Sequence, residues 1–208
     1  MDQPKIFPLF SAPVYINNVG SFPIPDFKQL EFTDNTPGAG YHGFLSTVDK
    51  YVLNRPEFQH IHQLVLGEIN RYTREVLAVN RRIEFYVTNS WININRPGDQ
   101  GGAHTHNNSL ISGVLYLKAP ANGGNILFYR DINSLLPFPP ALDLDIDSQN
   151  IYNCKQFGHS PKDFDVCLFP SVLMHSVGTN ESTEDRWCLP FNVFVKGELS
   201  GLHQLSLK

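Results

Sequence analysis

Residues 90–117, S-W-I-N-I-N-R-P-G-D-Q-G-G-A-H-T-H-N-N-S-L-I-S-G-V-L-Y-L, contain the pattern that decides the fold. Apolar and polar residues alternate over 91–95, which predicts a strand, and R-P-G-D at 96–99 predicts a turn after it. His104 and His106 follow the turn, and period 2 in an extended chain puts both imidazoles on one face. Two neutral imidazoles on one face can bind a metal ion as a pair.

Working outward, the second half of the chain is expected to form strand after strand, separated by turns such as Asn122-Gly123-Gly124. The expected strands are 83–88, 91–95, 110–118, 125–129, 165–169, 175–177 and 187–196. Near the amino end, 6–16 predicts one or two short strands at a sheet edge, because Pro8 and Pro13 interrupt it. Two turn-rich segments, 20–41 and 131–153, are expected to form loops or lids.

One long helix is predicted over 54–80, with Pro56 in its first turn. Its apolar stripe consists of Phe58, Ile61, Leu64, Val65, Ile69, Tyr72 and Val76. A second, shorter helix is predicted at 47–52. Together these elements predict a mainly β fold, a double-stranded β-helix (a jelly-roll or cupin-like barrel) with one or two N-terminal helices packed on one sheet. We expect a single domain over 1–208, in which 1–82 supports a jelly-roll core at 83–197.

Composition narrows the classes of function. The chain has 208 residues, 41% hydrophobic and 12% aromatic, which is enough for a sizeable core. The formal net charge of −4 and the lack of a basic run argue against binding to nucleic acid or to an anionic membrane. Three cysteines without a C-x-x-C motif indicate a reducing compartment. No apolar stretch is long enough to span a bilayer, and a secretion signal is not evident, so we expect a cytoplasmic location, in a bacterium or a virus-infected host.

A third metal-ligand candidate occurs far along the chain. His175 lies in F-P-S-V-L-M-H-S-V, and non-haem iron sites combine a close ligand pair with a distant histidine, which leaves coordination positions open on one side. Arg186 follows eleven positions later, and its planar guanidinium can pair with a carboxylate through two hydrogen bonds. On the strand that begins near Arg186, one face is expected to carry Arg186, Cys188, Pro190 and Asn192, and the other Leu189, Phe191 and Val193.

The order of motifs carries a family resemblance. H-T-H is followed by S-G-V-L-Y-L, G-G-N-I-L-F, F-P-S-V-L-M-H-S-V, Arg186 and L-P-F-N-V-F. This order resembles the 2-oxoglutarate- and Fe(II)-dependent oxygenase superfamily over roughly 85–197. More narrowly, it is similar to an oxygenase family of marine bacteria and their phages, which has W-x-N-x-x-x-x-G before the histidine pair.

The resemblance assigns roles by position. His104 and His175 match the two family histidines, and Arg186 matches the residue that anchors the far carboxylate of 2-oxoglutarate. Tyr116 falls on the strand whose aromatic residue lines the co-substrate pocket. The other polar candidates for this pocket are Asn93, Asn95 and Asn192.

The chain departs from the superfamily at one ligand. H-x-D or H-x-E is usual there, whereas the third position here is His106. Three imidazoles would leave the full charge of the metal ion uncompensated. We expect His106 to be the third ligand, with Asp99 or Asp131 as the alternative carboxylates.

The resemblance implies Fe(II), 2-oxoglutarate and dioxygen, and the hydroxylation of an unidentified small molecule or protein side chain with release of succinate and carbon dioxide. The resemblance is also compatible with a homodimer. A cupin-like metal-dependent isomerase or lyase and a non-catalytic jelly-roll binding module are the alternatives. At single residues, Arg186 could instead form a surface ion pair with Glu184 or Asp185, and Trp91 and Tyr116 could be core aromatics.

Overall fold

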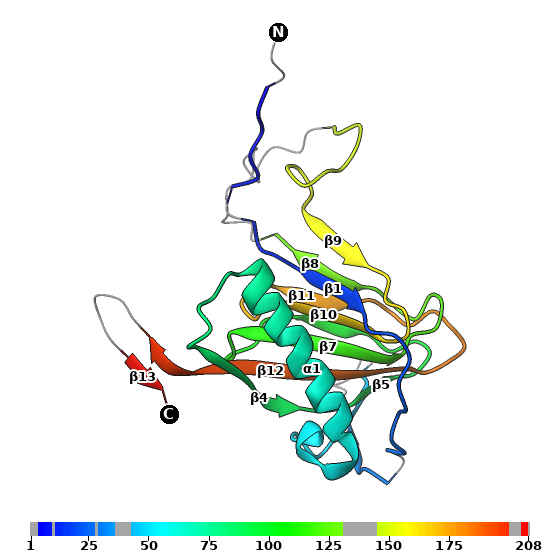
Figure 1. Ribbon diagram of the computed structural model, residues 1–208. Coiled ribbons are helices and arrows are strands. Elements are labelled where there is room, and N and C mark those ends of the chain that lie inside the picture. The colour runs from blue at the N-terminus through cyan, green and yellow to red at the C-terminus, as the bar shows by residue number, and fades with distance from the viewer. Residues whose placement is uncertain are drawn as a thin grey trace.

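The computed structural model describes residues 4–9, 11–27, 29–35, 43–130, 145–199 and 205–207. These residues form two antiparallel sheets that face each other as a jelly roll, with one α-helix across the larger sheet (Figure 1). The larger sheet has the order β1 (Tyr15–Asn18), β10 (Asp165–Pro170), β7 (Ile111–Lys118), β12 (Arg186–Leu199), β5 (Asn93–Asn95), β3 (Leu45–Thr47) and β2 (Phe32–Asp34), and β4 (Glu84–Ser90) and β13 (Leu205–Leu207) also pair with β12. The smaller sheet has the order β6 (Gly101–His104), β11 (His175–Val177), β8 (Ile126–Tyr129) and β9 (Gln156–His159).

Strand β12 connects the two halves of the larger sheet, because it pairs with β4, β5, β7 and β13. Its side chains alternate between the faces as expected. Leu189, Phe191 and Val193 are fully buried against the helix side. Cys188 belongs to a second cluster, between the two sheets, together with Phe128 of the smaller sheet.

The helical region is shorter and less regular than predicted over 54–80. Two 3₁₀ turns, η1 (Val52–Asn54) and η2 (Pro56–Phe58), precede α1 (Gln59–Arg71), and a π-helical turn, η3 (Tyr72–Val76), follows it. Pro56 does begin the first turn of η2, as expected. The prediction that Val76 belongs to the apolar stripe is wrong, because this residue is 47% exposed. The wider π turn rotates the apolar stripe, so that Thr73 is buried beside Tyr72.

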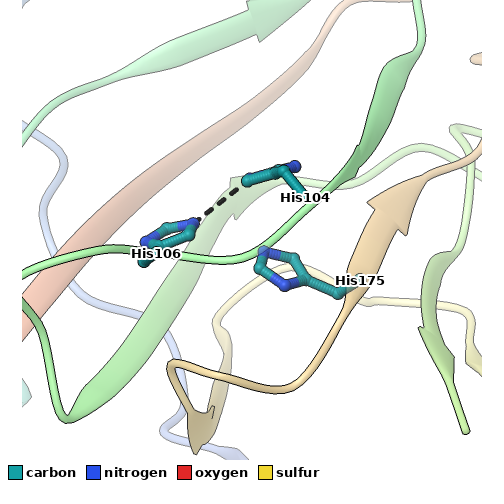
Figure 2. Close-up of side chains that lie close together, drawn as sticks. All are labelled: His104, His106 and His175. Atoms are coloured by element: carbon teal, nitrogen blue, oxygen red, sulfur yellow. Dashed lines mark hydrogen bonds between the residues drawn. The ribbon is translucent and has the colours of Figure 1, made fainter. Parts of the chain in front are cut away.

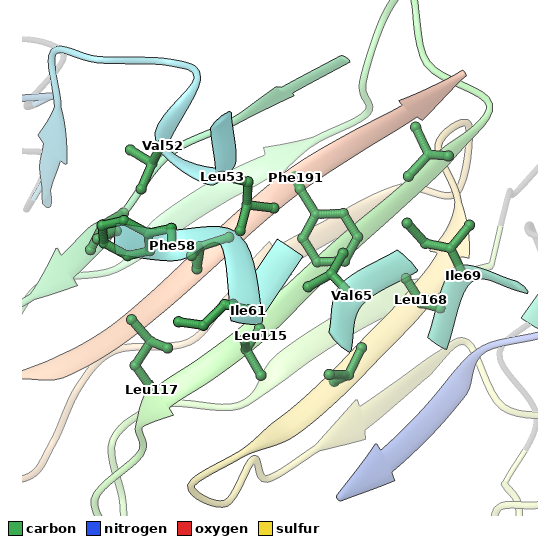
Figure 3. Close-up of a cluster of buried hydrophobic side chains, with 14 of the residues drawn as sticks. Val52, Leu53, Phe58, Ile61, Val65, Ile69, Leu115, Leu117, Leu168 and Phe191 are labelled. Carbon is green, nitrogen blue, oxygen red and sulfur yellow. The ribbon is translucent and has the colours of Figure 1, made fainter. Parts of the chain in front are cut away.

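The helix packs its apolar stripe on the outer face of the larger sheet. Ile61, Val65 and Ile69 project from α1 onto Leu115 and Leu168 of the sheet (Figure 3). All five side chains have no exposed surface. Burying a side chain of this size stabilises the fold by about 1.5–3 kcal/mol, so this layer fixes the position of β7, β10 and β12.

The predicted strands of the second half all form, with boundaries shifted by no more than about three residues. Strands β2, β3, β6, β9 and β13 were not predicted; they are only three or four residues long, and β6 begins with two glycines. Among the described residues of the segment 6–16, only the last two enter a strand, and β1 lies at the sheet edge as expected. The prediction of a short helix at 47–52 is wrong, because β3 ends at Thr47 and the 3₁₀ turn η1 begins only at Val52. The proposed lids at 20–41 and 131–153 lie partly outside the described residues.

Among the described residues, no helix combines the length and the apolar composition needed to cross a bilayer.

Candidate metal centre and its pocket

Strand pairing brings the distant histidine to the histidine pair. His104 ends β6 and lies directly opposite His175, the first residue of β11, in the antiparallel register. Side chains opposite each other in such a pair project to the same face. His106 lies two residues beyond the strand end, where its backbone N–H donates to the carbonyl of Ser171 at 3.0 Å. The three rings therefore surround one point (Figure 2), with their nearest ligand atoms all within 4.8 Å of one another.

Each imidazole is oriented by an acceptor on its Nδ1. The Nδ1–H of His104 donates to the carbonyl of Gly102 at 2.8 Å, and that of His175 donates to the carbonyl of Leu173 at 2.9 Å. The Nδ1–H of His106 donates to the side-chain oxygen of Asn192 at 2.5 Å. A carbonyl oxygen cannot donate, so each proton belongs on Nδ1 and each Nε2 keeps its lone pair.

Two of these lone pairs face each other. Nε2 of His104 and Nε2 of His106 are 3.2 Å apart. Two nitrogens bound at about 2.1 Å to one ion at a right angle lie about 3 Å apart, so the spacing fits a shared metal ion. Without a cation between them, two acceptors at this distance would repel each other. The donor set thus fits a divalent metal.

Burial keeps two of the imidazoles neutral. Burial lowers the pKa of His175 to about 4. The hydrogen bond to Leu173 raises this pKa, but by less than burial lowers it. Burial also lowers the pKa of His106, while the hydrogen bond to Asn192 raises it. Protons therefore compete weakly with a metal ion for these two side chains at neutral pH.

The support of His106 extends into the sheet. Asn192 was expected among the polar groups of the co-substrate pocket; its side chain instead lies behind His106 and is not part of the pocket lining. Its Oδ1 also accepts a hydrogen bond from the hydroxyl of Ser112 at 3.2 Å, which fixes the amide orientation. The hydroxyl of Ser112 is in turn 2.9 Å from that of Ser171. This network is neutral, so it adds no negative charge to the site.

Of the two carboxylate alternatives the structure describes only Asp99, which does not reach the three histidines. Asp99 is buried, and its Oδ2 accepts hydrogen bonds from the backbone N–H and Nε of Arg96. Asp99 does not belong to the cluster of potential ligands, which consists of the three histidines. Asp131 lies outside the described residues.

A pocket of about 430 Å³ adjoins the three histidines, and Arg186 lines it. The side chain of Arg186 is 1% exposed, and its Nη1 donates to the carbonyls of Gly123 and Gly124 at 3.0 and 2.8 Å. Its Nε is buried and has no partner among the described residues. The alternative, a surface ion pair of Arg186 with Glu184 or Asp185, is wrong, because Arg186 is buried, and Glu184 pairs with Lys118 at 2.7 Å.

Three other predicted residues line the pocket along with Arg186. Asn95 lies opposite Arg186 in the β5–β12 register, and Asn93 lies opposite Cys188. The Oδ1 of Asn93 is buried and has no partner in the described chain. Tyr116 is 2% exposed, and burial raises its pKa well above the usual value, so its phenol stays protonated as a donor. An arginine with an unused donor beside a protonated phenol fits a carboxylate, so the residues present fit 2-oxoglutarate.

Other residues of the pocket wall were missed or underrated. Trp91, weighed as a core aromatic, is only half-buried and lines the pocket, with its ring centroid 6.3 Å from that of His106. Lys50 also lines the pocket, although nothing in its local sequence indicates this. Gly124 was treated only as part of a turn, but its φ of +93° requires glycine, and its carbonyl holds Arg186.

Comparison with protein families supports the site. A family model described as "Putative 2OG-Fe(II) oxygenase" matches residues 89–192, which is half of the chain and includes all three histidines and Arg186. The chain belongs to this family. It is an oxygenase-family protein whose metal and co-substrate are Fe(II) and 2-oxoglutarate. Comparison with curated proteins gives no match.

Solved structures show the same fold at low sequence identity. A 2OG-Fe(II) oxygenase-family oxidoreductase from Burkholderia pseudomallei is 17% identical, with a TM-score of 0.54 over 78% of this chain and 71% of that chain. The α-ketoglutarate-dependent epimerase SnoN of nogalamycin biosynthesis is 13% identical, with a TM-score of 0.55 over 78% and 67%. HygX from Streptomyces hygroscopicus, with nickel and 2-oxoglutarate bound, is 11% identical, with a TM-score of 0.51 over 79% and 73%.

Proposed function

We propose that this oxygenase hydroxylates a small molecule with release of succinate and carbon dioxide. One observation carries the proposal. The Nε2 atoms of His104, His106 and His175 converge in the same pocket as the buried guanidinium of Arg186, whose Nε has no partner among the described residues. A metal site and a carboxylate anchor in one pocket are what a chelating keto acid with a second carboxylate requires.

In this proposal the three histidines hold Fe(II) through Nε2. The bound metal supplies the redox chemistry by which dioxygen oxidises 2-oxoglutarate and then the substrate. All three histidines line the pocket, so a metal ion that they held would be accessible to ligands from it. Because all three imidazoles are neutral donors, the site keeps the full charge of the ion, which favours a dianionic co-substrate.

Arg186 receives the far carboxylate of 2-oxoglutarate. Its Nη1 is held by Gly123 and Gly124, so the guanidinium is oriented before the ligand arrives. The phenol of Tyr116 and the amide of Asn95 are the further donors of this end of the pocket, and Asn93 lies next to them. Apolar side chains also line the pocket and reduce the contact of the reacting centre with water; they include Val114, Ile126, Phe169 and Val177.

Hydroxylation is the finer part of the proposal. It needs no protein group at the reacting carbon beyond the metal ligands, whereas an epimerisation such as that of SnoN must return a hydrogen to the substrate. Product analysis with isotopically labelled dioxygen separates these outcomes. Incorporation of labelled oxygen into the product supports hydroxylation, and a product without it points to another oxidative reaction.

The decisive experiment on the class of enzyme is spectroscopic. Anaerobic protein with Fe(II) and 2-oxoglutarate should show a visible charge-transfer band, and the same protein with Fe(II) and succinate should not, because succinate lacks the keto group. A cupin-like isomerase or lyase, to which three imidazoles are also suited, would give neither band nor succinate release. Failure of the band at saturating 2-oxoglutarate would overturn the proposal.

We further propose that the chain acts as one domain in a cytoplasmic setting. A homodimer stays a prediction, which sedimentation measurements would test.

A further inference from the structure

The pocket wall is unbalanced in charge. Its described lining residues include two basic side chains, Lys50 and Arg186, and no carboxylate. The three histidines add neutral donors around a divalent ion. In the proposed function, 2-oxoglutarate neutralises the metal and Arg186 only in part, so a cationic surplus is left in the pocket. Such a surplus is costly unless a ligand compensates it.

The ammonium group of Lys50 has a fixed position but no anionic partner. Its Nζ donates to the hydroxyl of Ser46 at 2.9 Å and to the carbonyl of Thr47 at 2.7 Å. Both acceptors are neutral, and Lys50 makes no ion pair within the described residues. Burial lowers the pKa of Lys50, as expected for a charge without a counter-ion. An ammonium has three donors, so one N–H is left for a ligand.

Lys50 and Arg186 are held by different elements of the pocket wall. The acceptors of Lys50 are in β3, and those of Arg186 are Gly123 and Gly124, in the turn before β8. The backbone N–H of Trp91 donates to the carbonyl of Pro190, and the Nζ of Lys50 lies 6.0 Å from the centroid of the Trp91 ring. Pro190 and Arg186 are both in β12, four residues apart, which corresponds to about 13 Å of strand. In the proposed function the keto acid chelates the metal and pairs with Arg186, so Lys50 is assigned to a second anionic group.

Trp91 connects Lys50 to the metal centre, since its ring also lies beside His106. We propose that the substrate is a small anionic molecule whose carboxylate or phosphate group binds Lys50, with its body along Trp91 toward the three histidines. This inference rests on the proposed function, because it assigns Arg186 to 2-oxoglutarate. The volume of about 430 Å³ is near the lower end of the range for ligand pockets, about 300–1,000 Å³. Since the co-substrate shares this volume, the substrate is small.

The test compares ligands of matched shape on protein loaded with Ni(II) and 2-oxoglutarate, which does not turn over. Benzoate is compared with benzamide, and phenyl phosphate with phenol, by calorimetric titration. We expect the anionic member of at least one pair to bind roughly tenfold more tightly than its neutral counterpart. The pair with the larger ratio identifies the substrate group as carboxylate or phosphate.

Variants assign the preference to Lys50. Lys50→Met keeps the apolar stem over Trp91 and should reduce the ratio to about one, whereas Lys50→Arg should retain it. Lys118→Met is the matched control: the Nζ of Lys118 lies 5.6 Å from the centroid of Trp187, outside the pocket lining, and its loss changes the net charge equally. The control should keep the ratio of the unmodified protein.

Three outcomes would overturn the inference: equal affinity for charged and neutral probes in the unmodified protein, no binding of either anion at millimolar concentration, or a ratio that survives Lys50→Met. The first two need no variant, so poor folding of Lys50→Met leaves the test intact. Failure of 2-oxoglutarate to bind counts against the proposed function alone, and the same ratios are then measured on the metal-free protein.

Discussion

Asn192 accepts the Nδ1–H of His106 from the same face of β12 that carries Arg186. One strand thus orients the third metal ligand through Asn192 and carries Arg186, the proposed anchor of the co-substrate. The geometry of the two sites is coupled through six residues of backbone, which the helix-covered core keeps in place.

Loss of the Asn192 amide should weaken metal binding. We expect Asn192→Ala to reduce the affinity for Mn(II) or Ni(II) by about 10–100-fold, the usual effect of removing a group that orients a ligating histidine. Calorimetric titration measures it. Asn93→Ala is the control, because Asn93 lines the pocket without contacting a histidine, and it should leave metal affinity unchanged. Equal losses in both variants would contradict the role of Asn192.

Replacing His106 tests the third ligand directly. His106→Ala should abolish stoichiometric metal uptake, whereas His106→Asp should retain it, because a carboxylate can occupy the same position and lowers the site charge. Elemental analysis after gel filtration measures the metal content. One full equivalent of metal in His106→Ala would point instead to a carboxylate such as that of Asp131.

Replacing Arg186, the proposed anchor, should weaken the binding of 2-oxoglutarate and leave the binding of the metal nearly unchanged. Arg186→Lys keeps the charge but loses the planar pair of donors, so we expect 2-oxoglutarate binding to weaken by at least about tenfold. Metal affinity should change by less than about threefold, since Arg186 contacts no histidine. Parallel titrations with metal alone and with 2-oxoglutarate measure both effects. A comparable loss of both affinities would argue for a structural role only.

The backbone that holds Arg186 has no room for a side chain. A Cβ at residue 124 would lie 2.2 Å from the carbonyl oxygen of Gly178 and 3.0 Å from Nη1 of Arg186. Gly20→Ala is a matched control, because Gly20 also has positive φ but no atom within 4 Å of that position. We expect roughly 1–2 kcal/mol of destabilisation in the control and an additional 1–3 kcal/mol or so in Gly124→Ala from overpacking. Urea unfolding measures the difference; equal values would contradict it.

As the pH falls, the metal-free protein should begin to lose stability at a higher pH than protonation of its carboxylates alone would cause. His175 has a folded-state pKa of about 4, below the ordinary value of about 6.5. The unfolded chain therefore takes up a proton that the folded chain refuses. The associated stability is present above about pH 6.5 and is lost as the pH falls toward 4, up to about 3 kcal/mol. Chemical unfolding at several pH values, with His175→Gln for comparison, measures this slope. An unchanged slope in the variant would contradict the assignment.

The parts of the fold that the sequence predicts are those with a strong repeating pattern. The alternation over β12 correctly assigns Leu189 to the helix side and Cys188 to the pocket side, since period 2 follows from strand geometry alone. Short strands such as β6 carry too few residues for a pattern. The π turn at Tyr72–Val76 inserts backbone that no apolar spacing reveals, and this misplaced Val76.

The structure brings together the three histidines that the sequence grouped, and their roles stay predictions. His104, His106 and His175 could be grouped because metal ligands are few and chemically distinctive. Lys50 could not be found, because its place in the pocket depends on how the segment before α1 folds against Trp91. Asn192 was assigned to the co-substrate, since its position on the strand fixes only the face and not the neighbour it contacts.

The alternation of β12 has a consequence for how this chain can vary over time. Odd-numbered residues of β12, such as Leu189 and Phe191, are constrained by packing beneath the helix. Even-numbered residues, such as Arg186 and Cys188, line the pocket, so the two sets are under different selective pressures. Substitutions at even-numbered positions between 186 and 192 can remodel chemistry while the scaffold persists. Insertion of one residue into that run would exchange the two sets and lose both scaffold and chemistry together.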